Sequence, residues 1–300
     1  MNAMHPPRTE QPHPGHAHLE AYGTRELVEA FIDDQADAAR AVQAASAQLA
    51  QAVEAAVPRL EAGGRIIYVG AGTSGRLGLL DSVELNPTFS WPSDRALALL
   101  AGGPSAVHGA VEGAEDDEEL GARDLAGLRP GPRDVVILLA ASGATPYTLG
   151  ALAAGRAAGA FTIGIANNPG SPLAAGADTG ITLDTGPEVI SGSTRLKAGT
   201  AQKIALNTFS SAVMVRLHKV FGNLMVDLQP TNAKLVQRAI RLIALATGVD
   251  EARAKAALEA CDRQVKPAIV AILKAIPPDQ ARQRLAEVHG SVRAALRDGS

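Results

Sequence analysis

The segment Arg65–Arg76 reads RIIYVGAGTSGR, a short apolar run followed by a loop that contains three glycines. The run Arg65–Val69 has the length and composition of a buried β-strand. A strand that ends in a glycine-rich loop and continues into a helix is typical of a β–loop–α unit, whose loop N–H groups can bind an anion. The segment therefore predicts an α/β fold with an anion-binding loop after its first strand.

The same alternation of apolar runs and helical patterns continues along the chain. Further strands are expected at Ala96–Leu100, Asp134–Ala140, Phe161–Ala166 and Gly180–Leu183. Helical patterns lie between them at Arg76–Glu84, Ser105–Leu128, Pro146–Ala158 and Pro172–Ala177, and a long one follows at Arg195–Phe221. Because the strands are apolar throughout, we expect a doubly wound, five-stranded parallel sheet of the flavodoxin-like order, covered on both faces. Ligands bind such a sheet where the strand order reverses.

Four regions follow from these patterns. Residues 1–24 are rich in Pro and His and are expected to form a flexible leader without a metal site. Residues 25–62 carry apolar side chains at steps of three and four, which predicts one N-terminal helix. Residues 63–231 form the α/β domain, and residues 232–300 a small helical domain. Its helices are expected at Ala233–Ala246, Val249–Asp262, Val265–Ala275 and Asp279–Leu296.

Composition excludes several classes of protein. Of the 300 residues, 46% are apolar and 20% charged, with a net charge of −3, which permits a full core and argues against binding to nucleic acid. A single cysteine, Cys261, allows neither a disulfide nor a cysteine-built metal site within one chain. The apolar runs are too short to span a membrane and no signal peptide is evident, so a cytoplasmic location is expected.

The glycine loop does not match the common nucleotide-binding motifs. Gly70, Gly72 and Gly75 have the spacing of a dinucleotide-binding loop, but the acidic residue expected about 20 residues later is missing. No lysine follows the last glycine, which excludes a Walker loop. The loop instead carries two hydroxyls, Thr73 and Ser74, as neutral donors for a compact phosphate monoester.

The third strand ends in a similar loop, which contains Ser142, Gly143 and Thr145. Strands one and three are neighbours at the switch point of the flavodoxin-like order, so both hydroxyl loops should converge on one crevice. One such turn is commonly only a helix cap, whereas two at the switch point favour a small phosphorylated ligand.

Several carboxylates fall near this crevice. Glu84 ends the first helical pattern, and Glu188 follows the fifth strand. Glu112, Glu115 and Glu119 are spaced to share one face of the second helix. For Glu112 and Glu115 the pattern leaves open whether they serve the site or form a solvated helix face.

A basic residue lies near the same edge of the sheet. Lys197 follows the Ser193-Thr194-Arg195 stretch, near the start of the long helix. It could hold a phosphate or stabilise an enolate, or it could be an ordinary surface lysine.

Six segments resemble the N-acetylmuramic acid 6-phosphate etherase family, whose members contain a SIS (sugar isomerase) domain. They are Gly70–Arg76, Val111–Asp116, Ala141–Tyr147, Gly186–Arg195, Lys197–Lys203 and Val220–Asp227. The resemblance covers roughly residues 25–296, with the segments in the same order. This chain has Ser82-Val83-Glu84 where the family has Ala-Ser-Glu, so the acid is kept.

The resemblance implies cleavage of the ether between D-lactate and a phosphorylated amino sugar, by elimination and then hydration. Glu84 would protonate the lactyl oxygen, and Glu115 would be the second catalytic carboxylate, acting as the base. No metal, nucleotide or flavin cofactor is implied, and the family forms homodimers in which a second subunit completes the site. The substrate-binding residues expected are Thr73, Ser74, Gly75, Ser142, Gly143, Thr145, Glu188, Ser193 and Lys197.

Two other functions use a similar domain. A sugar-phosphate isomerase shares the fold and similar acid–base groups, and the segments around Glu84 and Glu115 are what favour an etherase. A non-catalytic sugar-phosphate sensor such as the glucokinase regulatory protein also looks similar. That protein resembles two such domains in tandem, whereas this chain has length for one.

Overall fold

The computed structural model describes residues 6–297; the first five residues of the expected leader, including His5, and residues 298–300 lie outside this range. The described chain forms two compact units. The first contains the described residues up to Val83 together with Ser93–Ser210. The second contains Glu84–Pro92 together with the described residues from Ser211 onward, so its boundary falls earlier than residue 232.

A parallel sheet forms the centre of the first unit. Its strands are β1 (Ile66–Gly70), β2 (Ala96–Leu100), β3 (Val135–Ala140), β4 (Phe161–Ala166) and β5 (Thr179–Thr182). The strand order is β2-β1-β3-β4-β5, and every neighbouring pair is parallel. This confirms the predicted flavodoxin-like order, in which β1 and β3 are neighbours at the switch point.

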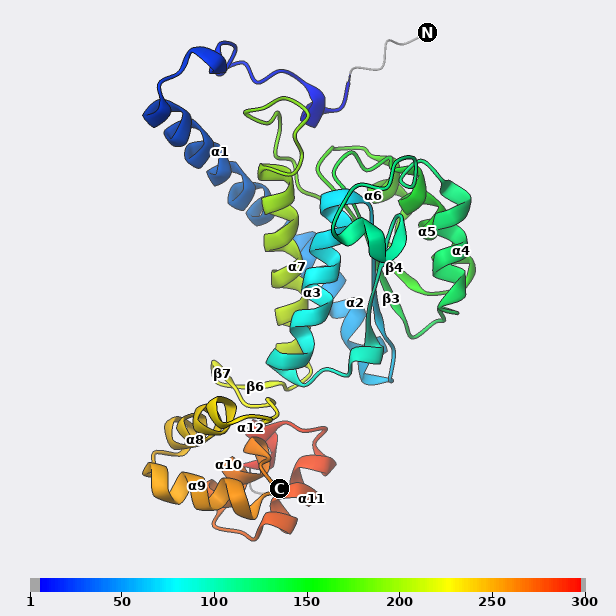
Figure 1. Cartoon of the computed structure of the whole chain (residues 1–300). Helices are drawn as coiled ribbons and strands as arrows, with labels where there is room; N and C mark the ends of the chain where they lie inside the picture. The colour runs from blue at the N-terminus through cyan, green and yellow to red at the C-terminus, as the bar shows by residue number, and fades with distance from the viewer. Residues whose placement is uncertain (1–5, 298–300) are drawn as a thin grey trace. The chain divides into compact units, whose positions relative to one another are not determined.

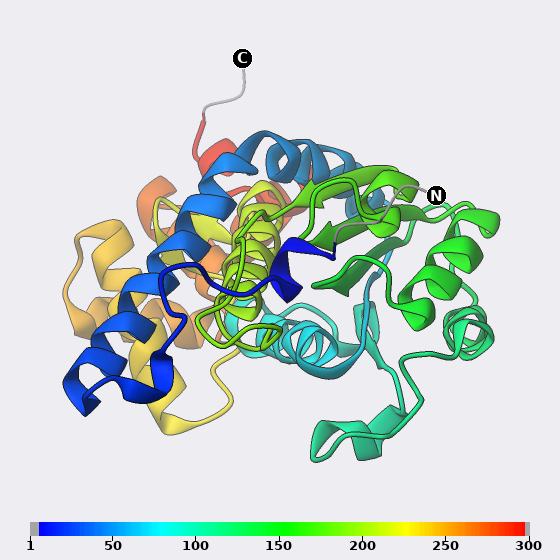
Figure 2. The same cartoon turned by 90° about the horizontal axis from the view of Figure 1, so that it is seen from above.

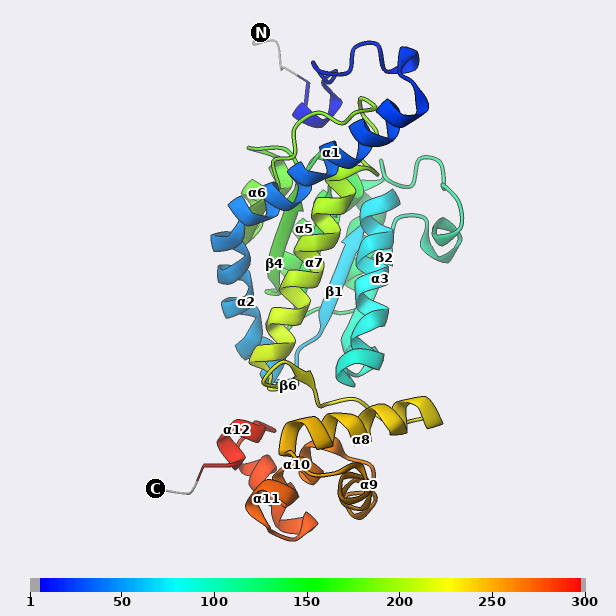
Figure 3. The ribbon, with the colours of Figure 1, turned by 90° about the vertical axis from the view of Figure 1, so that its left-hand side faces the viewer.

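Helices cover both faces of this sheet (Figures 1 and 3). One face carries α2 (Ser46–Glu61), α3 (Gly72–Phe89) and α7 (Lys197–Arg216). The other carries α4 (Glu118–Gly127), α5 (Pro146–Ala157) and α6 (Pro172–Gly176). Because both faces are covered, β1, β3 and β4 are buried along their whole length, which explains their unbroken apolar sequences.

The expected single N-terminal helix is two helices. α1 (Thr24–Ala44) ends at Ala45, and α2 begins at Ser46. Only α2 packs on the sheet, whereas α1 crosses the start of α7, where Asp34 and Gln35 bond to α7 side chains. An alanine-rich sequence favours helix without setting its direction, so tertiary packing decides where the chain turns.

The expected long helix over Ser105–Leu128 is also wrong. A short 3₁₀ turn, η4 (Gly103–Val107), is followed by turns, and α4 begins only at Glu118. Gly113 has φ +73°, which ends helical geometry, and the Asp117 carboxylate accepts the Leu120 N–H and so caps α4. Glu112 and Glu115 therefore lie on a loop and do not share a helix face with Glu119.

The described part of the leader, residues 6–23, is largely exposed but is attached to the rest of the first unit around Thr9. It contains two 3₁₀ turns, η1 (Arg8–Glu10) and η2 (Leu19–Ala21), and Thr9 is fully buried. Figure 2 shows this blue segment beside the yellow-green loop that precedes α7. Both lie beyond the carboxyl ends of the strands, where Figures 1 and 3 also show them.

The second unit is helical, with one short hairpin that the sequence did not predict. Its elements are β6 (Val220–Phe221), β7 (Leu224–Met225), α8 (Ala233–Thr247), α9 (Glu251–Ala260), α10 (Val265–Lys274), α11 (Pro278–Glu287) and α12 (Val292–Ala295). The expected helix Asp279–Leu296 is divided, because His289 and Gly290 both have positive φ. Cys261 is buried in the core of this unit.

Among residues 6–297, no helix has the length and apolarity that crossing a membrane requires.

A short 3₁₀ turn, η3 (Ser93–Arg95), leads into β2 of the parallel sheet.

Candidate functional site

A cavity of about 440 Å³ opens at the carboxyl ends of β1 and β3. Its lining comes from the loop after β1, the loop after β3, the turn before α4, the leader and the loop before α7. The lining residues are Glu10, Ala71, Gly72, Thr73, Ser74, Glu115, Asp116, Leu139, Ala140, Ala141, Ser142, Ala144, Thr145, Pro146 and Thr194. This is the switch-point crevice that the two hydroxyl loops predict.

The first hydroxyl loop places Thr73 and Ser74 in the first turn of α3. The opening turn of a helix has N–H groups without partners inside the helix, and these attract an anion. Gly75 acts through close packing, because a Cβ there would lie 2.6 Å from the Gly70 carbonyl oxygen. The glycines of the motif thus let strand and helix approach each other, and Thr73 and Ser74 both line the cavity.

The second hydroxyl loop ends at Thr145, which is the N-cap of α5. The Thr145 side chain makes no capping bond, and its hydroxyl forms a 3.4 Å hydrogen bond with the Ser142 hydroxyl, which also accepts the Ala144 N–H at 3.2 Å. Both residues line the cavity. Gly143 has φ +69°, and a Cβ there would collide with Ser171 at 2.3 Å. The turn therefore requires glycine at this position.

The lining contains no lysine or arginine within the described residues, whereas it contains three carboxylates: Glu10, Glu115 and Asp116. A phosphate bound here would have to be held by hydroxyls and backbone N–H groups at the two helix starts. Charge repulsion would keep it away from the carboxylates, which are left for other parts of a ligand.

Glu115 is positioned by its backbone. Its carbonyl oxygen accepts the Tyr147 N–H at 3.0 Å, which ties the turn before α4 to the first turn of α5. Tyr147 is itself buried and donates its hydroxyl to Asp124 of α4 at 2.7 Å. Burial in the first place, and Asp124 in addition, raise the pKa of Tyr147 far above its usual value, so it remains a neutral donor.

Glu84 does not line this cavity. It lies on α3 twelve residues after Gly72, which is about three helical turns, and its side chain is exposed. Its apolar neighbours Leu80 and Val83 are also exposed, at 40% and 56%. The two predicted catalytic carboxylates are therefore not brought together within the described cavity.

Glu188 and Lys197 are buried, and they do not line the cavity either. The Glu188 carboxylate accepts the backbone N–H groups of Lys197 and Ala198 and so caps α7. Burial raises the pKa of Glu188 despite these two donors. The Lys197 ammonium donates to Asp34 of α1 at 2.6 Å and lies 3.6 Å from Asp37.

Sequence reasoning did not single out Thr194 or Glu10 as cavity residues. Thr194 lines the cavity, whereas its predicted neighbour Ser193 instead donates its backbone N–H to Ile190 within a turn. Glu10 belongs to the leader that the sequence predicted to be flexible. Thr194 lies inside Gly186–Arg195, one of the six segments that carry the resemblance, so that segment was the available signal. Glu10 reaches the cavity through contacts between segments far apart in the chain.

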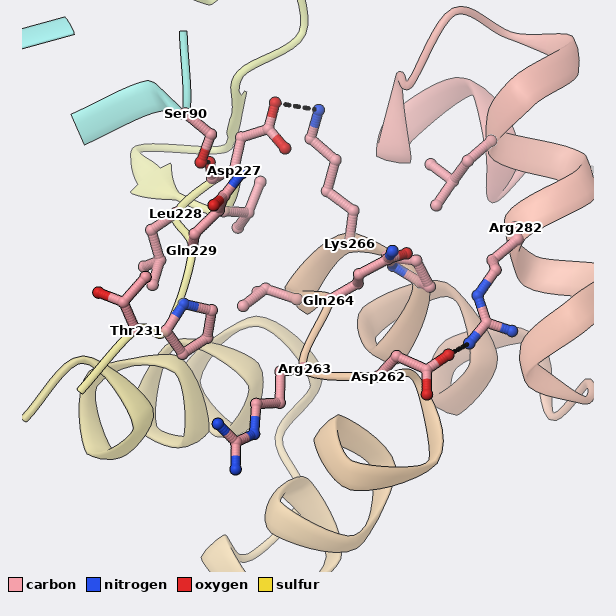
Figure 4. A pocket seen from close by; sticks show the side chains of 15 residues that line it. Ser90, Asp227, Leu228, Gln229, Thr231, Asp262, Arg263, Gln264, Lys266 and Arg282 are labelled. Carbon is pink, nitrogen blue, oxygen red and sulfur yellow. Dashed lines mark hydrogen bonds and ion pairs between the residues drawn. The ribbon is translucent and has the colours of Figure 1, made fainter. Parts of the chain in front are cut away.

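A further cavity, of about 650 Å³, lies within the second unit (Figure 4). Asp227 there accepts from Lys266 at 3.0 Å and Lys219 at 2.5 Å, and Asp262 pairs with Arg282 at 2.5 Å. Burial, the largest effect, lowers the pKa of Lys266, although Asp227 opposes it. None of the predicted site residues lines this cavity within the described chain.

Comparisons with known proteins extend over nearly the whole chain. A model described as Glucokinase regulatory protein N-terminal SIS domain matches residues 48–156, and a SIS domain model matches residues 114–212. The chain is 59% identical over 294 residues to the N-acetylmuramic acid 6-phosphate etherase of Deinococcus radiodurans, covering 98% of this chain and 96% of that protein. It is 50% identical over 291 residues to the Rubrobacter xylanophilus protein of that name, covering 97% and 96%.

The solved structures found in the comparison have lower sequence identities. A putative sugar-phosphate isomerase from Listeria monocytogenes is 20% identical with a TM-score of 0.47, covering 65% of this chain and 93% of that one. A phosphoheptose isomerase from Francisella tularensis is 17% identical with a TM-score of 0.47, covering 64% and 98%.

Proposed function

The chain belongs to the N-acetylmuramic acid 6-phosphate etherase family, and on that premise we propose that it cleaves the D-lactyl ether of N-acetylmuramic acid 6-phosphate. The products are N-acetylglucosamine 6-phosphate and D-lactate. The observation that carries the proposal is 59% identity over 294 residues with a curated etherase. A cavity with two hydroxyl loops and neighbouring carboxylates fits a phosphorylated sugar and so supports it.

The reaction needs a base and an acid. In the open-chain sugar, the aldehyde makes the proton on the second carbon acidic, and Glu115 removes it. Glu84 protonates the lactyl oxygen as it leaves the third carbon, and water then adds to the unsaturated aldehyde. Each proton transfer contributes about 10²–10⁴-fold to the rate.

Glu84 is supplied, in this proposal, by a second copy of the chain. Glu84 lies about three turns along α3 from the loop after β1, and it does not line the cavity of its own chain. The exposed apolar side chains beside it are suited to an interface between copies. The proposed enzyme is therefore a homodimer. It works in the cytoplasm, because its substrate is a charged sugar phosphate, which does not cross a bilayer unaided.

The phosphate is held by the starts of α3 and α5 together with the hydroxyls of Thr73, Ser74, Ser142 and Thr145. Glu188 and Lys197 contribute by holding the loop that carries Thr194, rather than by touching the ligand. The sequence led us to expect Glu188 and Lys197 to bind the substrate directly, whereas in this proposal they act through the loop.

The test is release of D-lactate from N-acetylmuramic acid 6-phosphate by the purified protein. Glu84→Ala and Glu115→Ala should each lower the rate at least about 100-fold, because each removes one proton transfer. Glu112→Ala is the matched control, since Glu112 is exposed on the same turn and does not line the cavity. No lactate from the wild type, with the sugar phosphate still raising its Tm, would indicate a sensor instead.

A further inference from the structure

The leader contributes one side chain to the cavity, and that side chain is a carboxylate. Glu10 lies in the 3₁₀ turn η1, 61 residues before Ala71, the first cavity residue of the loop after β1. Within the described residues, no hydrogen bond or ion pair reaches its carboxylate. The leader thus brings an acceptor without a partner to the cavity wall.

The backbone next to Glu10 is fixed by a buried exchange of hydrogen bonds. The fully buried Thr9 donates its N–H to the Asn168 side chain at 3.3 Å and accepts the Asn168 amide on its hydroxyl at 3.0 Å. Its carbonyl oxygen also accepts the Gly192 N–H at 3.2 Å. Losing one partner would leave the others buried and unsatisfied, so these contacts hold the turn strongly.

Contacts on either side of Thr9 and Glu10 complete the attachment. The Arg8 guanidinium pairs with Asp184, and the Ser191 hydroxyl donates to the Gln11 carbonyl at 2.9 Å. Residues 8–11 are therefore bound at several points to the loop before α7, the loop that also carries Thr194.

Gly192 provides the space in which the Glu10 carboxylate lies. It has φ +76°, and a Cβ at this position would lie 2.9 Å from Glu10 Oε2. A residue with a side chain would be strained in its backbone, and the Glu10 carboxylate would have to move away from the added Cβ. The Glu10 carboxylate therefore lies against the backbone of the loop that carries Thr194, beside the cavity.

We infer that Glu10 is a substrate-binding residue, whose carboxylate accepts hydrogen bonds from hydroxyl or amide N–H groups of the bound sugar. An ionised carboxylate only accepts, so it cannot bind the phosphate or the lactyl carboxylate and must face the neutral donors of the sugar. The leader is then part of the active site. This inference rests on the proposed function for the identity of the sugar.

The experiment compares Glu10→Gln with Glu20→Gln, the same chemical change at an exposed position elsewhere in the leader. Substrate KM, the dissociation constants of N-acetylglucosamine 6-phosphate and inorganic phosphate, and Tm are measured for both variants and the wild type. Glu10→Gln should weaken binding of the sugar phosphate and raise KM by about ten- to a hundredfold, the effect of one charge-assisted hydrogen bond. Inorganic phosphate should bind as tightly as before, Tm should stay unchanged, and Glu20→Gln should match the wild type.

Two results would overturn the inference. Equal sugar-phosphate affinity in Glu10→Gln and wild type would mean that Glu10 does not touch the sugar. A lower Tm together with equal losses for sugar phosphate and inorganic phosphate would mean that Glu10 only holds the loop. Because the binding measurements need no turnover, they remain decisive if the wild type releases no lactate, a result that would contradict only the proposed etherase activity.

Discussion

Lys197 at the start of α7 and Asp34 on α1 form a buried ion pair. Lys197 is 1% exposed and Asp34 7%, and their charged atoms are 2.6 Å apart. The second oxygen of Asp34 has no hydrogen-bond partner within the described residues. A buried pair of this kind is costly to break, because the charge that remains is buried without compensation.

Replacing Lys197 should therefore act first on stability. Lys197→Met is expected to lower the free energy of unfolding by about 3–5 kcal/mol, and adding Asp34→Asn should recover part of that loss. Urea denaturation measures both. Lys203→Met is the control, because Lys203 is half-buried on the same helix and donates to the neutral Asn207 side chain; it should change stability by less than about 1 kcal/mol. A higher KM for Lys197→Met with unchanged stability would contradict this and favour direct contact with substrate.

Asp134 joins the starts of β1 and β3 through Arg65. Its carboxylate accepts from the Arg65 side chain at 2.7 Å and from the backbone N–H groups of Arg65 and Gly131. Burial alone would raise the pKa of Asp134, but these hydrogen bonds outweigh it and hold the pKa below the usual 3.8.

The stabilisation from Asp134 should accordingly depend on pH. A folded-state pKa below the unfolded value means that the contribution is present above pH 3.8 and is lost as the pH falls through the lower, folded-state value. Above pH 5, Asp134→Asn should be less stable than the wild type by about 1.5–3 kcal/mol, and this gap should close in acid. Urea denaturation between pH 7 and 3 tests this, with exposed Asp33→Asn as the control. A gap that widens in acid would refute the assignment.

Among the elements, α4 and α5 make an unusually close contact. A Cβ at Gly121 would lie 1.9 Å from the Tyr147 carbonyl oxygen, and one at Gly150 would lie 1.9 Å from the Glu118 carbonyl oxygen. The two helices can therefore touch through their backbones only with glycine at both positions. This contact also holds the turn that carries Glu115, since Tyr147 donates to its carbonyl.

Gly121→Ala should force α4 away from α5. We expect a loss of at least about 1–3 kcal/mol in the free energy of unfolding, together with a fall in activity as Glu115 moves. Gly127→Ala is the matched control in the same helix, because nothing lies within 4 Å of its Cβ position. That variant should be neutral or more stable by up to about 1 kcal/mol. Thermal unfolding and lactate release measure both variants, and equal behaviour of the two would contradict the packing argument.

Exposed apolar side chains on α1 offer a surface at which two copies of the chain can associate in the proposed dimer. Val28 and Ile32 lie one turn apart on α1 and are 52% and 65% exposed. The protein should elute at twice the chain mass of 30.8 kDa in size exclusion with light scattering. Replacing both residues with aspartate should shift it toward the monomer at micromolar concentration, because charge at an apolar interface is unfavourable. A wild-type monomer at that concentration would argue against a site completed by a second copy.

The sequence by itself determined the sheet and the two hydroxyl loops that line the switch-point cavity. The five strands were predictable because a strand buried on both faces must be apolar throughout, a pattern that is local. The hydroxyl loops that contain Thr73 and Ser142 were predictable for a related reason: parallel strands bring their carboxyl ends to the same edge of the sheet. Residue patterns that repeat within a few positions carry this information without any long-range contact.

Only the tertiary structure decided which side chains reach the cavity and which are buried in pairs beside it. Lys197 meets Asp34 across 163 positions of the chain, and Thr9 meets Asn168 across 159. Each of these contacts joins two segments that are far apart in the sequence. Neither segment has a local pattern that indicates its partner. Burial and pairing arise only when the chain is folded, so the buried ion pair of Lys197 and the place of Glu10 in the cavity wall could not be read from local pattern.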